Sequence, residues 1–113
     1  MNFEELPKFK DKIDLSFAKD AYYNRQPHDA ERIVLLEEVL ERYKNVPLNI
    51  DFKNGETDVI EHTNALLKKH NYAENVIWGS FSKSATDKCK VINPDISRFA
   101  SKGDFSKLCS YIM

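Results

Sequence analysis

Residues 46–53 show the clearest pattern in the chain, because apolar and polar residues alternate along them. The apolar positions fall on one face of an extended segment: Leu48, Ile50 and Phe52. The polar positions fall on the other face: Asn49, Asp51 and Lys53. Helical patterns flank this strand, and that order favours a parallel sheet covered by helices. We therefore expect Asp51 and Lys53 to lie at a strand end where α/β proteins build their sites, and not simply to face water.

The rest of residues 31–113 continues as a helix followed by three strand–helix units. The first helix begins at about residue 34, where apolar side chains recur at helical spacing, and Pro47 stops it. The predicted strands are 46–53, 76–78 and 96–100, and a helix follows each. The fold class is therefore α/β, with about three parallel strands and intervening helices.

The predicted helices carry recognisable start signals and buried stripes. The expected caps are Thr57 or Asp58 for the second helix and Ser82 or Ser84 for the third, and the last helix starts near Asp104. The expected buried stripe of the second helix is Val59, Ile60, Thr63, Leu66 and Leu67. Trp78 alternates with Val76 and Ser80 on one strand face and is expected in the core.

Residues 1–30 lack such periodicity. They are charged, their apolar side chains are scattered, and Pro7 interrupts any early helix. We expect a long irregular loop or leader that packs a few aromatic side chains on the core.

Length, charge and composition argue against several classes of protein. A chain of 113 residues is one domain at most, and it is shorter than the roughly 250 residues of a complete eight-fold barrel. A formal net charge of −1 leaves no electrostatic footprint for nucleic acid. No stretch approaches the roughly 20 apolar residues of a membrane-spanning helix. No apolar run follows Met1, so we expect no signal peptide. Cys89 and Cys109 stand alone, which predicts reduced thiols in a cytoplasmic chain by default.

A set of linked motifs resembles the glycerophosphodiester phosphodiesterase family. The motifs are Leu36-Glu37-Glu38-Val39-Leu40, Pro47-Leu48-Asn49-Ile50-Asp51-Phe52-Lys53, Val76-Ile77-Trp78-Gly79-Ser80-Phe81 and Asn93-Pro94-Asp95-Ile96-Ser97-Arg98-Phe99. The opening Phe3-Glu4-Glu5-Leu6-Pro7 resembles the eukaryotic, membrane-associated branch. The likeness implies that residues 1–113 form part of a TIM-type (β/α) barrel domain, N-terminally truncated, with residues 1–30 as an excursion between two barrel strands.

The resemblance assigns roles to two residues. It implies that Asp51 is one ligand of a divalent metal, Mg²⁺ or Ca²⁺, in an incomplete site. It also implies that Lys53 binds the phosphate as a point charge. Ser80 is a third candidate, for substrate binding, because it ends the second predicted strand and its hydroxyl is expected to point into the same mouth. The competing interpretations are a solvated Asp–Lys pair and a turn or cap serine.

The family's catalytic motifs are missing. The family's His-Arg-Gly opening and its Glu-x-Asp metal pair are not found ahead of the first helix, and His28-Asp29 stands too close to that helix to be the catalytic His-Asp pair. His28, His62 and His70 are therefore expected at the surface. A general acid–base group commonly raises the reaction rate about 10²–10⁴-fold. Because the chain lacks the family's pair, we assign no catalytic residue and expect the chain alone to be inactive.

The function implied by the resemblance is a metal-assisted phosphoric diester hydrolase of lipid metabolism that cleaves glycerophosphodiesters or lysophospholipids. Sphingomyelin-cleaving lyases of venoms share the barrel and stay open as an alternative substrate class. The alternative from another class is a non-catalytic barrel remnant that acts as a binding or assembly module. In either case the open edges of an incomplete barrel predict self-association.

Overall fold

The computed structural model describes residues 2–112. The chain divides into two compact units, residues 1–35 and residues 36–113. No helix in the described residues is long and apolar enough to cross a membrane.

The first unit contains a short antiparallel hairpin. A 3-10 turn, η1 (Phe3–Glu5), is followed by β1 (Lys12–Asp14) and β2 (Tyr22–Asn24), with Ile13 opposite Tyr23. The Lys12 ammonium lies 3.9 Å from the centroid of the Tyr22 ring. The expectation of an irregular segment over residues 1–30 is therefore wrong in part. Tyrosine favours strands, and Asp20 adopts a left-handed conformation (φ 59°) that turns the chain between them.

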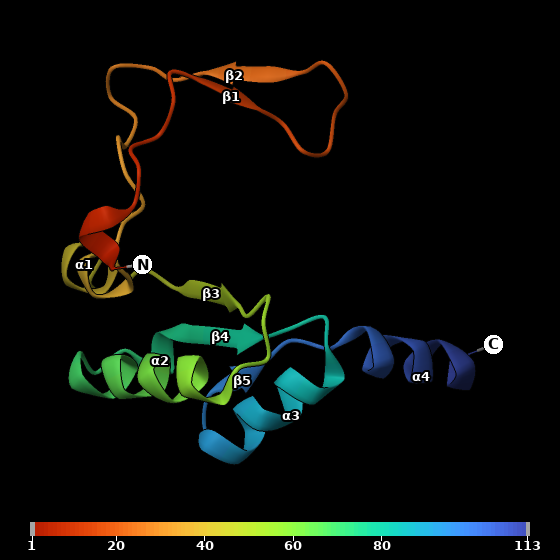
Figure 1. Cartoon of the computed structure of the whole chain (residues 1–113). Helices are drawn as coiled ribbons and strands as arrows, with labels where there is room; N and C mark the ends of the chain where they lie inside the picture. The colour runs from red at the N-terminus through yellow and green to blue at the C-terminus, as the bar shows by residue number, and fades with distance from the viewer. Residues whose placement is uncertain (1, 113) are drawn as a thin grey trace. The chain divides into compact units, whose positions relative to one another are not determined.

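The second unit has the predicted order of a helix followed by three strand–helix units (Figure 1). Its helices are α1 (Leu36–Arg42), α2 (Thr57–Lys69), α3 (Lys83–Ile92) and α4 (Lys102–Ile112), with a 3-10 turn η2 (Ala73–Asn75). Its strands are β3 (Leu48–Asp51), β4 (Val76–Gly79) and β5 (Ser97–Arg98). The sheet order is β3-β4-β5 and both pairings are parallel, as predicted from the sequence. These three strands do not close into a barrel.

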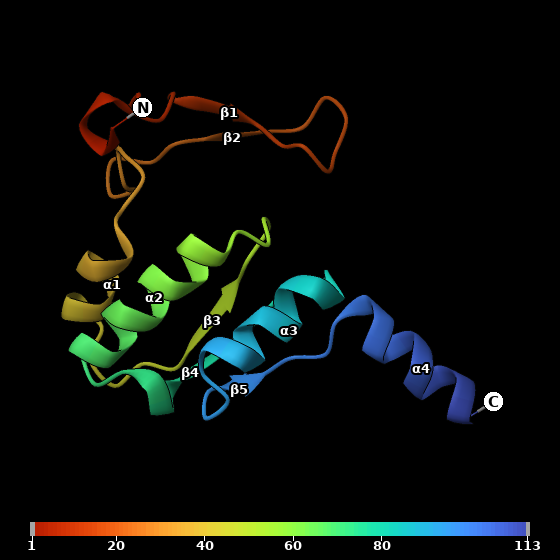
Figure 2. The same ribbon diagram turned by 60° about the horizontal axis from the view of Figure 1, so that its bottom comes forward.

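Helices α2 and α3 lie on the same side of this sheet (Figures 1 and 2). The core beneath them contains Trp78, which is fully buried, as predicted, and meets Phe52 edge-on at a centroid distance of 5.8 Å. The other core side chains come from α1, α2, β4 and α3 and from the residues directly before η2 and β5: Leu40, Ile60, Leu67, Tyr72, Val76, Cys89 and Ile96. Burial of this apolar surface is the main force that holds the βα units together.

The opposite face of the sheet is open within residues 36–112. Asn49, Asp51, Ile77 and Ser97 point to that side and are exposed. Within this unit Asp51 and Lys53 are therefore open to water, and their expected place in a barrel mouth or crevice stays a prediction.

The predicted helix caps are confirmed in part. Ser82 caps α3 as predicted, and its side chain accepts a hydrogen bond from the Ala85 N–H. The predicted caps of α2 are wrong, because Thr57 and Asp58 already lie inside the helix and Glu56 holds the cap position. The buried stripe of α2 also differs: Val59 is 46% exposed, and Asn64 is buried instead.

Candidate functional site

The candidate site lies at the carboxyl edge of the parallel sheet. Asp51 is the last residue of β3 and Lys53 follows two residues later, while Ser80 comes directly after β4. The Phe52 N–H donates to the Gly79 carbonyl over 2.9 Å, which fixes these two strand ends side by side. Parallel strands present their carboxyl ends at one edge, and this is where α/β folds bind ligands.

Asp51 and Lys53 form a direct ion pair between the Lys53 Nζ and Asp51 Oδ2 atoms. The Lys53 side chain is 76% exposed and that of Asp51 is 32% exposed. An exposed pair of this kind contributes little to stability. The ammonium has three donors, so two stay available to an incoming anion.

The Ser80 hydroxyl makes its hydrogen bond within its own turn. Ser80 is 3% exposed, and its hydroxyl accepts a hydrogen bond from the Ser82 N–H over 3.1 Å. Its backbone exchanges two hydrogen bonds with the Thr86 hydroxyl, at 3.1 and 3.0 Å. These contacts give Ser80 a role in the turn before α3, the alternative that the sequence left open, and substrate binding by Ser80 stays a prediction.

Two phenylalanines at the same edge stand in the family motifs but were given no role from the sequence. Phe81 is 72% exposed, and the Lys53 ammonium lies 5.5 Å from its ring centroid. Phe99 is half-buried, and its ring lies against Gly79. The signal that could have found Phe81 is its position one residue after the predicted end of a parallel strand.

A second polar cluster joins α1 to the end of α2. Ligand atoms of Glu37, Glu41 and His70 lie within 4.8 Å of one another, but Lys69 Nζ already contacts a Glu37 carboxylate oxygen at 2.5 Å. The Lys69 ammonium and then the His70 imidazole hold the pKa of Glu37 below its ordinary value. His70 is not a plain surface histidine as expected, because its side chain is only 17% exposed and lies 3.1 Å from Glu37. Since α2 ends before β4 begins, this cluster lies toward the amino ends of the strands.

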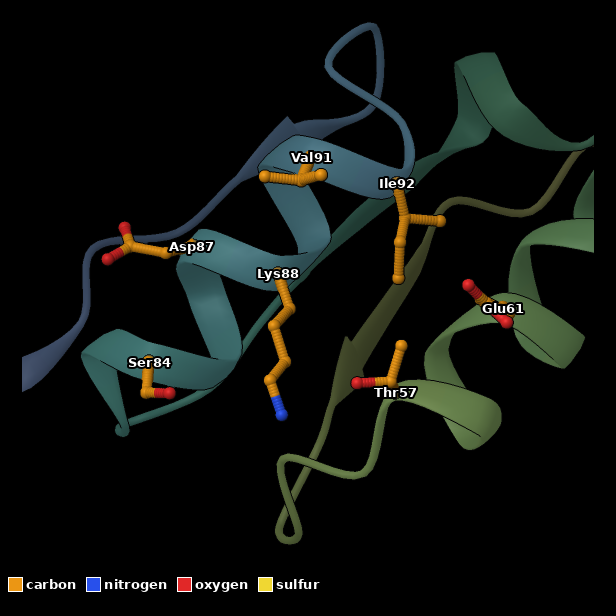
Figure 3. Close-up of a pocket in the computed structure, with 7 residues that line it drawn as sticks. All are labelled: Thr57, Glu61, Ser84, Asp87, Lys88, Val91 and Ile92. Carbon is orange, nitrogen blue, oxygen red and sulfur yellow. The ribbon is translucent and has the colours of Figure 1, made fainter.

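A groove of about 590 Å³ separates α2 from α3 (Figure 3). Lys88 and Ile92 extend from α3 into it, and the Lys88 ammonium donates to the Gly55 carbonyl over 2.5 Å. The groove is lined by α2 and α3, and neither Asp51 nor Lys53 is among its lining residues.

The known proteins that this chain is similar to share one name, lysophospholipase D. The chain is 28% identical to human lysophospholipase D GDPD3 over its full length, and 32% and 31% identical to lysophospholipase D GDPD1 of Homo sapiens and Rattus norvegicus over 85% of its length. The chain belongs to the glycerophosphodiester phosphodiesterase family. It spans about a third of the length of these relatives, 30–35%. No family model matches the chain, and no solved structure matches it.

The edge that carries Asp51 and Lys53 is the kind of place where α/β folds bind ligands. The chain supplies only part of such a site. His62 lies within α2 and His70 directly follows it, so neither histidine comes from the carboxyl edge of the sheet. The expected surface position of His62 is confirmed, and its Nδ1 lies 2.7 Å from the Asp58 carbonyl oxygen.

Proposed function

We propose that this chain is part of a phosphoric diester hydrolase of lipid metabolism that cleaves glycerophosphodiesters or lysophospholipids to a phosphomonoester and an alcohol. The proposal is supported by relatives named lysophospholipase D and by the position of one exposed cation, Lys53, at the carboxyl edge of a parallel sheet. In this proposal residues 31–113 are three βα units of an incomplete TIM-type barrel, and the excursion over residues 1–30 connects to it.

Lys53 carries the chemistry that the chain itself supplies. Its ammonium would bind a non-bridging phosphate oxygen and stabilise the negative charge that grows there in the transition state. Asp51 would hold the ammonium in position until the phosphate arrives, since the two side chains are already paired. Proton transfer to the leaving alcohol needs a separate acid, and we assign that role to no residue of this chain.

The family implies a divalent metal, and the residues present do not make a complete site for one. Asp51 offers a single carboxylate that is already paired with an ammonium. Ca²⁺ takes about six to eight oxygen ligands, and Mg²⁺ takes about six, usually one or two carboxylates together with waters and substrate phosphate oxygens. The one metal-compatible group found among residues 2–112 is the Glu37–Glu41–His70 cluster, which Lys69 neutralises in part. Asp51 as one metal ligand therefore stays a prediction, and no reaction step is routed through a metal.

Binding of a small phosphate ester tests the proposal. The phosphorus NMR signal of sn-glycerol 3-phosphate is followed while the 113-residue chain is added. We expect Lys53→Gln to weaken binding about ten-fold or more, because a charge-assisted hydrogen bond is lost.

Lys83→Gln is the matched control, because Lys83 is also an exposed lysine paired with an aspartate, Asp87, at 2.8 Å. It should leave phosphate binding unchanged. Equal affinity of the Lys53→Gln variant and the unchanged chain would refute the assignment of the phosphate to Lys53.

The open sheet face favours a second function, an assembly module. β3 and β5 are edge strands within the described sheet, and Ile77 on the uncovered face is 47% exposed. A partner that completes the sheet would cover both features. Sedimentation of the chain alone and with candidate partners separates this function from catalysis, since a stable, well-folded monomer would argue against it.

A further inference from the structure

Phe81 occupies an unusual position for a large apolar side chain. It is 72% exposed, and it lies in the connection between β4 and α3 at the same sheet edge as Lys53. The Lys53 ammonium is 5.5 Å from the centroid of its ring. The ring therefore already faces a cation, at a distance within the roughly 6 Å range of cation–π attraction.

The backbone around Phe81 is fixed on both sides. Its carbonyl accepts a hydrogen bond from the Lys102 N–H over 3.1 Å. On the preceding side, the buried Ser80 holds the Ser82 N–H and is itself bound to Thr86. A side chain that is exposed on a rigid connection is preorganised for contact with a ligand, because binding does not have to order the loop.

We propose that Phe81 and Lys53 together form a subsite for a phosphodiester that carries a quaternary ammonium alcohol such as choline, with the ammonium group on the Phe81 ring and the phosphate on Lys53. In choline esters of phosphate the ammonium and the phosphate are separated by a two-carbon link. A cation and an aromatic face about 5.5 Å apart suit two groups at that separation.

Charge explains why the ring is free to take the ligand's ammonium. When the phosphate binds Lys53, it draws the lysine ammonium toward itself and neutralises it. The ring face then loses its own cation contact, and a quaternary ammonium is the cation that aromatic side chains hold best, since it is weakly hydrated. The inference rests on the proposed phosphate-binding role of Lys53.

Saturation-transfer NMR with glycerophosphocholine and sn-glycerol 3-phosphate as probes tests the subsite on the full 113-residue chain. We expect saturation of the choline methyl protons in the unchanged chain. Phe81→Ala should remove most of this signal and weaken glycerophosphocholine binding about two- to five-fold, while glycerol 3-phosphate binds as before. Phe81→Tyr should retain both.

Phe105→Ala is the control, because Phe105 is another exposed phenylalanine, 61% exposed, on α4. It should change neither probe, and thermal unfolding of each variant reports whether it is folded. The inference is overturned if Phe81→Ala leaves glycerophosphocholine binding unchanged, or if it weakens both probes equally. In those cases a loss of binding in Lys53→Gln would leave the proposed function standing. If Lys53→Gln binds both probes as the unchanged chain does, or if the unchanged chain binds neither, the proposed function fails as well.

Discussion

At the scale of single residues, close contacts decide which positions tolerate change. Gly79 ends β4 directly beneath Phe99, and a Cβ atom there would lie 3.2 Å from two carbons of the phenyl ring. Gly79 is also buried between strands whose ends define the candidate site. A tight contact with a ring that is itself packed leaves little room for relaxation.

Gly79→Ala is therefore expected to lower the free energy of unfolding by about 1–3 kcal/mol, because it overpacks this edge. Gly103→Ala is the control, since the nearest atom to a Cβ there is the flexible Lys83 side chain at 3.5 Å and the position is inside α4. The control should be neutral or stabilise by up to about 1 kcal/mol through helix propensity. Urea unfolding of both variants measures the difference, and equal effects would show that the Phe99 contact is not tight.

A second residue-scale prediction concerns Glu37 and pH. Its pKa is lowered, mainly by the Lys69 hydrogen bond and then by His70, so the pair contributes stability above the ordinary glutamate pKa and loses it as the pH falls through the depressed value. Glu37→Gln should therefore lower the urea midpoint at about pH 7 and have little effect at about pH 3.

Glu74→Gln gives the comparison, because Glu74 is exposed in η2 and has no ion pair recorded among residues 2–112. Its effect on the urea midpoint should be small, because no ion pair is lost. A Glu37→Gln effect that grows in acid would contradict the assigned sign.

At the scale of elements, the sequence predicted the regular parts and missed the contacts between distant segments. Alternation located β3 and helical spacing located α2, because both signals lie within a few residues of chain. The contact of His70 with Glu37 joins residues 33 positions apart, so no local pattern could reveal it. The hairpin in the first unit was missed for another reason, since its strands of three residues each are too short to show a periodic signal.

The start of α4 offers an element-scale test. Ser101 is fully buried, its hydroxyl accepts from the Asp104 N–H at 3.2 Å, and it donates to the Asp104 carboxylate at 2.6 Å. Ser101→Ala should lower the free energy of unfolding by about 1 kcal/mol, the usual cost of a lost helix cap. Ser106→Ala in the same helix removes an exposed hydroxyl that bonds only to the Lys102 carbonyl, and should have a smaller effect. Equal urea midpoints for the two variants would show that Ser101 does not act as the cap.

At the scale of the whole molecule, the chain carries three parallel strands that do not close on themselves. The parallel order and the position of Asp51 and Lys53 at the carboxyl edge followed from the sequence. The exposure of the sheet face that carries Asp51 did not follow from the sequence, because the expectation of a covered interior assumed the strands of a complete barrel. Which residues of an open sheet face water depends on what packs against it.

The open edges and face predict self-association at micromolar concentration. Ile77→Lys places a charge on the uncovered face and should shift sedimentation toward monomer. Val91→Lys is the control, because Val91 is 83% exposed but lies on α3, and it should leave association unchanged. A stable monomer of the unchanged chain with cooperative unfolding would contradict the prediction and favour a self-sufficient α/β domain.

The central claim is that the carboxyl edge of β3 and β4 binds the phosphate of a phosphodiester. Mapping of amide chemical shifts over the chain during titration with glycerophosphocholine tests it most directly, because the method does not choose the site in advance. We predict saturable shifts at residues 51–54 and 80–82, lost in Lys53→Gln. Saturable shifts confined to the α2–α3 groove at Thr57, Glu61 and Lys88, or at the Glu37 cluster, would contradict the claim.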